Sequence, residues 1–445
     1  MSDPRTGASE PGHAATPSLS HTLRSIASLL ASTAFLLASI GLLGTLIPLR
    51  GVAAGFSGAL LGALAGVYYA GFLLGTYAMP PLVRRIGHIR AFAFGTACAA
   101  CIALLHALAT WPWLWLLLRL VDGIMMVGLY TIIESWINAK APPGYRGTVF
   151  AIYMMVNAGA EGLSQLLLRI DVRPFVLFTV VALLALSATL PIVLTRQAQP
   201  APQTTPRLQL RRLFTLAPTS GVGALLAGLA LGAFYGLAPA YARRVGFDTA
   251  VTSTYMLGGI LGGAALQWPL GYWSDHTDRR LALAAVGAAA CLIAVTIAFI
   301  GGGQPRTAIA LIFGYCGMAF AIYPMVVAHL IDYVAPTELL GASSSVYLLY
   351  GAGSTIGPLT VGIAMTRWGA RSLPFWYALT AGALAVYAAY RYGAFRRERV
   401  ADNNFLPLTR ATLTSLRWLH PQGSPNGRSQ LIRPGGAASP PPRRR

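Results

Sequence analysis

The sequence predicts an all-α membrane protein, with twelve transmembrane helices arranged as two pseudo-symmetric six-helix bundles. Of its 445 residues, 55% are hydrophobic and only 10% are charged. Soluble domains average about 25% charged residues, because a water-facing surface needs them. The second observation is an internal duplication, in which residues of the first half of the chain recur at corresponding positions of the second half.

The duplication has an offset of 191 to 194 residues. The matching positions are Pro48 and Pro239, Gly55-Phe56 and Gly246-Phe247, Tyr130 and Tyr323, Gly147 and Gly341, Tyr153 and Tyr347, and Gly159 and Gly353. Internally repeated helical membrane proteins are often transporters, because two similar halves can rock about a site between them.

Twelve apolar segments are long enough to cross a bilayer, for which about 20 residues are needed. Because every backbone polar group in lipid must be bonded within its segment, we expect helices. A β-barrel would need short alternating segments, and we find no such pattern in the sequence. The expected spans are 26–48, 58–79, 91–109, 112–136, 148–169, 174–195, 218–242, 251–272, 281–303, 308–332, 343–366 and 374–393.

Polar segments divide these spans into regions. We expect a cytoplasmic tail at 1–24, a first bundle at 25–195, a cytoplasmic loop at 196–217, a second bundle at 218–395, and a disordered tail rich in arginine and proline at 396–445. The net charge of +20 comes from arginines between and after the spans, which form no packed basic face. This pattern argues against nucleic acid, and the positive-inside rule places both termini in the cytoplasm.

A loop motif follows the second span of each half. The second copy is Gly271-Tyr272-Trp273-Ser274-Asp275-His276-Thr277-Asp278-Arg279-Arg280. The first copy is degraded, with Pro80 and Arg84 at the glycine and aspartate positions, whereas Arg85, Gly87 and Arg90 remain. With its two six-helix halves and this loop, the chain resembles the major facilitator superfamily. The fourth span adds that family's arginine followed four residues later by glycine, here Arg119 and Gly123.

Several short stretches resemble the YcaD-like bacterial branch of this superfamily. They are Thr45-Leu46-Ile47-Pro48-Leu49, Arg85-Ile86-Gly87, Glu134-Ser135 and Tyr153-Met154-Met155-Val156. The family's antiporter motif is absent from the fifth span. The resemblance implies a monomeric, multi-pass protein of the bacterial inner membrane, surrounded by lipid.

The resemblance also implies a cytoplasmic gate, in which loop arginines meet acidic groups at the helix ends. The gate candidates are Glu134, Arg84, Arg85, Arg90, Asp275, Arg279 and Arg280. Glu134 lies near the cytoplasmic end of the fourth span. It either receives the arginines of residues 84–90 or reaches the membrane surface by itself.

Four ionisable residues lie deep within spans: Arg119, Asp122, Glu134 and Glu161. A charge at the bilayer centre costs roughly 2.5–3.5 kcal/mol on insertion scales, so such groups face a cavity or a partner. Arg119 and Asp122 are three residues apart and can meet on one helix. Because Glu161 lies at a similar depth on the next span, we expect Arg119 to contact Asp122, Glu161 or both. The carboxylates then either couple protons to transport or form a static ion pair.

A substrate cavity is expected near the midplane, between the halves. Its candidate residues are Tyr68, Asn157, Tyr235, Gln267, Trp268, Tyr323 and Tyr347. This mixture of amide, phenol and one embedded arginine suits a small polar or anionic metabolite, and it leaves a drug-like amphiphile open.

No motif suggests an enzyme or a cofactor. The single lysine, Lys140, follows no glycine-rich phosphate loop, and no His-Glu-x-x-His or Cys/His metal spacing occurs. We therefore predict a secondary transporter that moves a small solute by alternating access, either by proton-coupled symport or by facilitated uptake or efflux. The alternative is a membrane sensor or another non-transport protein on the same fold.

Overall fold

The computed structural model describes residues 19–194, 209–334 and 336–394, and within these ranges it is helical without strands. The tail predicted at 396–445 and most of the tail predicted at 1–24 lie outside the described residues. The same holds for residues 196–208 of the predicted central loop.

The described part of the first half contains seven α-helices and two 3-10 turns. The α-helices are α1 (Leu19–Ala53), α2 (Gly58–Ile86), α3 (His88–Leu108), α4 (Pro112–Lys140), α5 (Arg146–Ser164), α6 (Pro174–Ser187) and α7 (Thr189–Val193). The 3-10 turns are η1 (Pro143–Tyr145), which precedes α5, and η2 (Gln165–Arg169), which follows it. Proline at the first position of α4 and α6 suits a helix start, since its missing N–H has no partner there in any case.

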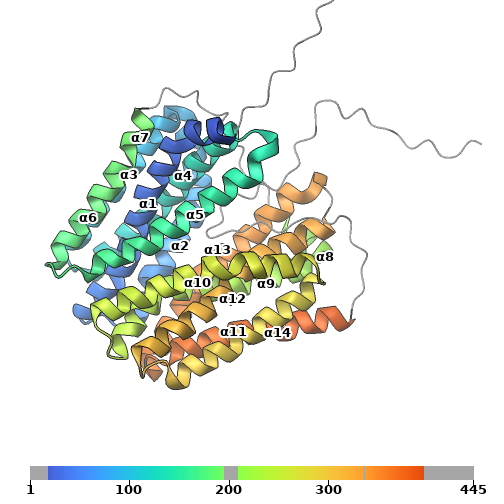
Figure 1. The fold of residues 1–445 in the computed structure, drawn as a ribbon. Coiled ribbons are helices and arrows are strands. Elements are labelled where there is room, and N and C mark those ends of the chain that lie inside the picture. Colours follow the sequence, from blue (N-terminus) through green and yellow to red (C-terminus); the bar gives the residue numbers. More distant parts are fainter. Residues whose placement is uncertain (1–18, 195–208, 335, 395–445) are drawn as a thin grey trace, which may run out of the picture.

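The second half follows the same plan. After the short α8 (Leu210–Leu216) come α9 (Pro218–Arg244), α10 (Thr249–Asp275), α11 (Arg279–Ile300), α12 (Pro305–Tyr333), α13 (Pro336–Trp368) and α14 (Ser372–Ala394). Figure 1 shows α1–α7 as one group of helices and α9–α14 as another, with α5 beside α10.

Eleven segments of the described chain are long and apolar enough to cross a membrane. The predicted fifth span, 148–169, corresponds to α5 and η2 and is not among them, because polar residues such as Asn157 and Glu161 lower its hydropathy. Since α5 packs between α1 and α10, these polar groups are covered by protein. Polar residues buried in this way inside a helical bundle are compatible with a spanning helix.

Helix packing repeats between the halves as the sequence does. The main contacts of the first half, α1 with α5, α2 with α4 and α3 with α6, correspond to α9 with α13, α10 with α12 and α11 with α14.

The turn after the first helix of each half is also repeated. Gly55 and Gly246, with φ of 77° and 97°, follow α1 and α9 in the left-handed conformation that glycine adopts readily. Ser57 and Asp248 then cap α2 and α10.

Glycine allows the two halves to approach closely where α2 meets α13. A side chain at Gly62 would overlap the Pro358 carbonyl oxygen, and a Cβ at Gly58 would lie 2.7 Å from the Gly362 carbonyl oxygen. A related contact joins α5 and η2 to α10. Small residues at such crossings bring backbones together, as in other membrane bundles.

Three hydrogen bonds link the halves at the end of the bundle that carries Ser57, which we call the Ser57 end. The Ala59 amide donates to Thr366 Oγ1 (2.8 Å), Arg244 Nη2 donates to the Phe56 carbonyl (3.2 Å), and Ser253 Oγ donates to the Gln165 carbonyl (2.6 Å). We call the opposite end, where α10 turns into α11, the Arg279 end; it corresponds to the predicted cytoplasmic side.

We predict that replacing Gly62 by valine lowers the melting temperature in detergent, because the added side chain must push α2 away from α13. Overpacking of this kind typically costs about 1–3 kcal/mol. Gly159→Ala is the matched control, since nothing lies within 4 Å of the Cβ position at Gly159 in α5. Alanine is the better helix former, so this control should melt at the same or a slightly higher temperature. Equal melting temperatures for Gly62→Val and the unsubstituted protein would contradict the close-packing argument.

Candidate functional site

A central cavity of about 50 Å³ lies between the two halves. Seven helices and one turn contribute to its lining. Among the lining residues are Thr45 of α1, Tyr68 and Tyr69 of α2, Ala99 of α3, Arg119, Asp122 and Met126 of α4, Glu161 of α5, Gln165 of η2, Tyr235 of α9 and Met256 of α10. A cavity needs about 10–15 Å³ to hold one water, so this one has room for several waters or one compact group.

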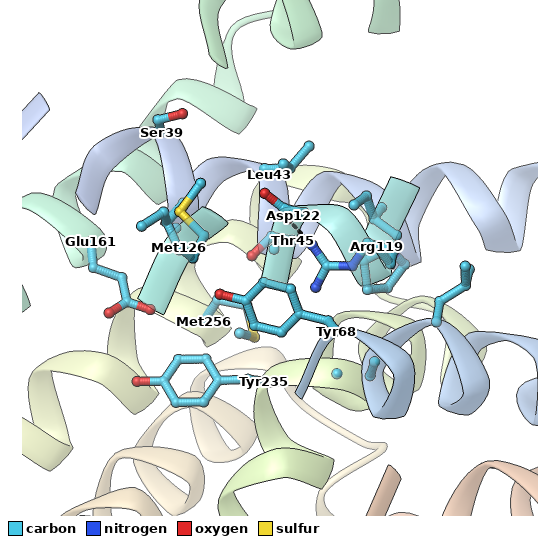
Figure 2. A pocket seen from close by; sticks show the side chains of 18 of the residues that line it. Ser39, Leu43, Thr45, Tyr68, Arg119, Asp122, Met126, Glu161, Tyr235 and Met256 are labelled. Carbon is cyan, nitrogen blue, oxygen red and sulfur yellow. Dashed lines mark hydrogen bonds and ion pairs between the residues drawn. The ribbon is translucent and has the colours of Figure 1, made fainter. Parts of the chain in front are cut away.

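Arg119 and Asp122 form a buried ion pair on α4. Arg119 Nη1 lies 2.7 Å from Asp122 Oδ2, and Arg119 and Asp122 are 9% and 2% exposed. The Tyr68 ring covers the guanidinium, with its centroid 4.0 Å from Cζ. Arg119 Nε and Asp122 Oδ1 have no hydrogen-bond partner in the described structure. Figure 2 shows Arg119 and Asp122 on one side of Tyr68 and Glu161 on the other.

Gly123 explains why Tyr68 can reach the guanidinium. A side chain at Gly123 would overlap the Tyr68 carbonyl oxygen, so only glycine lets α2 lie this close to α4. Gly71 and Gly75 of α2 meet the α4 backbone in the same way. The arginine–glycine spacing seen in the sequence therefore has a physical basis, in which the arginine carries charge and the glycine brings the aromatic ring over it.

Glu161 lines the same cavity from α5 and is 3% exposed. A Cβ at Gly41 of α1 would lie 2.9 Å from Glu161 Cγ, so this glycine leaves the space that the glutamate side chain occupies. Of the contacts expected for Arg119, the structure has the one with Asp122. Glu161 shares the cavity with that pair from a neighbouring helix.

Gln165 is a cavity residue that the sequence analysis missed. Its Nε2 donates to the Gly41 carbonyl (2.9 Å) and its Oε1 accepts from Thr45 Oγ1 (2.7 Å), which ties η2 to α1. Its backbone carbonyl accepts the bond from Ser253 of α10. The available signal was its place four residues after Glu161, on the same helical face.

A layer of tyrosines lies between the cavity and the Arg279 end. Four of its members, Tyr130, Tyr153, Tyr323 and Tyr347, are two pairs of repeat-related positions, and each is at most 3% exposed. The candidate Asn157 lies with them. The hydroxyls of Tyr323 and Tyr347 and Oδ1 of Asn157 have no hydrogen-bond partner in the described structure.

Glu134 belongs to this tyrosine layer and is fully buried. It accepts a hydrogen bond of 3.2 Å from the Tyr153 hydroxyl. Of the two positions considered from the sequence, a site at the membrane surface does not fit this burial. Arg84, Arg85 and Arg90, the arginines considered as its partners, have exposed side chains.

The remaining cavity candidates separate clearly. Tyr68 and Tyr235 line the cavity, whereas Asn157, Tyr323 and Tyr347 lie in the tyrosine layer. Gln267 does not line the cavity; its Nε2 donates to the Phe320 carbonyl (3.1 Å) and joins α10 to α12. Trp268 is 72% exposed on the outer surface of α10 and stacks on Tyr272.

The second-half loop motif forms a compact group of ion pairs at the Arg279 end. Arg279 is 4% exposed and bonds to both Asp275 (2.8 Å) and Asp332 (2.6 Å), which joins α10, α11 and α12. Arg280 pairs with Asp278 (2.9 Å) and donates to the Arg391 carbonyl of α14 (3.2 Å). Asp278 also accepts from the Arg280 amide and caps α11.

The comparisons with known proteins agree with this architecture. The family model for the Major Facilitator Superfamily matches residues 29–349. The chain is 28% identical over 341 residues to an uncharacterized MFS-type transporter, YcaD, of Escherichia coli, covering 73% of this chain and 84% of the relative. It is 27% identical over 340 residues to YcaD of Salmonella heidelberg, with the same coverage.

Solved structures show the same fold at low sequence identity. The nucleoside transporter NupG superposes with a TM-score of 0.68 at 14% identity, covering 84% of this chain and 99% of that chain. A bacterial homologue of the human lysosomal transporter Spinster, in an inward-facing and occupied conformation, superposes with a TM-score of 0.66 at 17% identity, covering 83% and 96%. The chain therefore belongs to the major facilitator superfamily, is a membrane transport protein, and is similar to the YcaD transporters, as its loop and span motifs predicted.

Proposed function

We propose that this protein couples the movement of a small solute to protons, by alternating access to the central cavity. The observation that carries the proposal is a cavity lined by two carboxylates and one arginine, in which one carboxylate is paired with the arginine on its own helix. Asp122 pairs with Arg119 within α4, while Glu161 faces the same cavity from α5. We assign the proton to Glu161 and a structural role to the Arg119–Asp122 pair.

The reason for this division is electrostatic. The Arg119 guanidinium, 2.7 Å away, favours the charged form of the Asp122 carboxylate, because opposite charges attract. Protonation of Asp122 would leave the Arg119 charge without its partner, which costs free energy in a low-dielectric interior. A carboxylate on a separate helix can instead gain or lose a proton as the cavity opens to water on one side or the other.

The interfaces between the halves are suited to rocking. At the Ser57 end the halves share single hydrogen bonds, such as those of Thr366 and Arg244, and the α2–α13 contact consists of glycine against backbone. A neutral hydrogen bond such as that of Thr366 contributes only about 0.5–1.5 kcal/mol in exchange with water, and one from a charged donor such as Arg244 about 1.5–3 kcal/mol. Separating the halves at this end therefore breaks no strong ionic link among these contacts.

We further propose that the Arg279 end is the cytoplasmic gate. Arg279 with its two carboxylates would hold α10, α11 and α12 together as one body. The exposed arginines Arg84, Arg85 and Arg90 of the first-half loop would belong to the same gate. We also propose that the protein is a monomer of the bacterial inner membrane, with both termini in the cytoplasm.

The experiment starts from the purified full-length protein in detergent. Thermal stabilisation is measured with a panel of sugars, nucleosides, amino acids, carboxylates and organic cations at acidic and neutral pH. Nucleosides are included because NupG is a nucleoside transporter, and fucose because another fold relative, FucP of Escherichia coli, is a fucose:proton symporter with a TM-score of 0.54. A ligand that binds only the folded form raises the melting temperature by mass action. Ligands found in this way are then tested in proteoliposomes under a pH gradient, with an entrapped pH dye.

We predict that Glu161→Gln abolishes accumulation of the ligand against its gradient and the accompanying proton flux, while exchange across equal concentrations continues. Glutamine keeps the size and polarity of the side chain but cannot release a proton. Glu338→Gln is the matched control, because Glu338 forms an exposed ion pair with Arg212 away from the cavity. Uphill transport by Glu161→Gln at the rate of the unsubstituted protein would exclude the proposed role.

We predict a different pattern for the ion pair. Arg119→Leu or Asp122→Leu alone should each destabilise the protein by about 3–5 kcal/mol, because each leaves a buried charge without its partner. The double variant should be close to the unsubstituted protein in stability. Unfolding in detergent, analysed as a double-mutant cycle, measures this coupling. Additive losses in the double variant would mean that the two side chains act independently.

A further inference from the structure

We propose that the central cavity recognises a compact monovalent organic cation, an amine or quaternary ammonium. Glu161 serves as its counter-ion, and tyrosine rings form the walls. This inference names the substrate class of the site described under the proposed function and so rests on that function. It replaces the small polar or anionic metabolite expected from the sequence.

The first argument is the charge of the lining. The residues that line the cavity include one cationic side chain, Arg119, and two acidic ones, Asp122 and Glu161. With both carboxylates ionised, the cavity carries one net negative charge. A charge in a low-dielectric site attracts a ligand of opposite sign and repels one of its own sign. A monovalent cation neutralises the lining, whereas a monovalent anion doubles the imbalance.

The second argument is that the arginine is already engaged. Asp122 lies 2.7 Å from Nη1, and the Tyr68 ring covers the guanidinium at 4.0 Å. An anionic ligand would have to compete with a carboxylate held on the same helix turn, at a position fixed by the i,i+3 spacing. A covalently positioned partner is favoured over a free one, because its ordering has no further entropic cost.

The third argument is the chemistry of the walls. The rings of Tyr68, Tyr69 and Tyr235 and the thioethers of Met126 and Met256 line the cavity around the carboxylates. The face of an aromatic ring carries negative potential and attracts cations, and quaternary ammonium groups are commonly bound in this way. Methionine adds a polarisable surface that adapts to apolar substituents on the cation. Figure 2 shows Glu161 and the hydroxyl of Tyr235 on the same side of the cavity, so one ligand can touch both.

The size of the cavity limits the ligand. Its volume of about 50 Å³ admits a compact group rather than an extended chain. Gly41 and Gly44 of α1 line the cavity, and Gly44 has open space beside it, so the α1 wall is smooth at this point. A small, nearly spherical ammonium head matches these dimensions.

The test compares three ligands of similar branched shape, in which a quaternary carbon replaces the nitrogen of choline in the neutral and anionic members. Choline is the cation, dimethylbutanol is its neutral isostere, and dimethylbutanoate is the anion. We expect choline to raise the melting temperature of the full-length protein in a neutral detergent, while the other two do not. Tetramethylammonium, which has the size of the choline head, provides a second cation. Stabilisation by dimethylbutanoate but not by choline, or by neither cation at millimolar concentration, would overturn the inference.

Variants place the cation in the cavity. Glu161→Gln should raise the dissociation constant for choline by at least about tenfold, because it removes the counter-ion. Tyr235→Phe, which keeps the ring, should bind choline nearly as well as the unsubstituted protein, whereas Tyr235→Leu should bind it about threefold to tenfold more weakly. Trp368→Leu is the control, since Trp368 is 77% exposed on the outer surface. Unchanged choline affinity in Glu161→Gln would exclude this carboxylate as the counter-ion.

The inference and the proposed function can fail separately. Proton-coupled transport of a neutral or anionic solute that depends on Glu161 would refute the cation and leave the proposed function intact. Choline binding that depends on Glu161, without any flux of choline or protons in proteoliposomes, would support the cation site and refute coupled transport.

Discussion

The buried ion pair between Arg119 and Asp122 is the interaction on which the central cavity depends. A guanidinium inside a membrane bundle requires a partner, and the nearest carboxylate lies three residues away on the same helix. Because that partner belongs to α4 itself, the pair stays neutralised whatever the neighbouring helices do. Gly123 then brings the backbone at Tyr68 against α4, and the ring covers the remaining charge. The helices around this pair can therefore move without exposing an unpaired charge.

The two halves have the same helix arrangement, but their charged residues lie at different positions. At the repeat offset, Arg119 and Asp122 correspond to Ile312 and Tyr315, and Tyr315 stacks on Tyr377 with ring centroids 4.5 Å apart. The deep ion pair thus lies in the first half, while the corresponding positions of the second half hold an apolar side chain and a stacked tyrosine. At the Arg279 end the asymmetry is reversed, because the second-half loop has a complete ionic group and the first-half loop has exposed arginines. The two halves thus share their helix arrangement, but the deep ion pair belongs to the first half and the ionic group at the Arg279 end belongs to the second.

Glycine connects this division of tasks to motion. At Gly62 and Gly123 the helices meet through backbone atoms and not through large interlocking side chains. A change in the angle between these helices therefore requires little side-chain repacking. The tyrosine layer closes the cavity toward the Arg279 end, and single hydrogen bonds close it toward the Ser57 end. Under the proposed mechanism, these two sets of contacts would open in turn.

The sequence by itself determined the helices, their duplication, the family and which charges lie deep, because hydropathy, repeat offsets and charge positions are properties of the chain. Helical periodicity also brought Arg119 and Asp122 together, since residues three apart share a face. Only the tertiary structure decided what lies across from each face. It turned Trp268 outward, buried Glu134 beside Tyr153, and placed Gln165 among the cavity residues. Those outcomes depend on the rotation and separation of neighbouring helices, which side-chain packing sets and no single helix specifies.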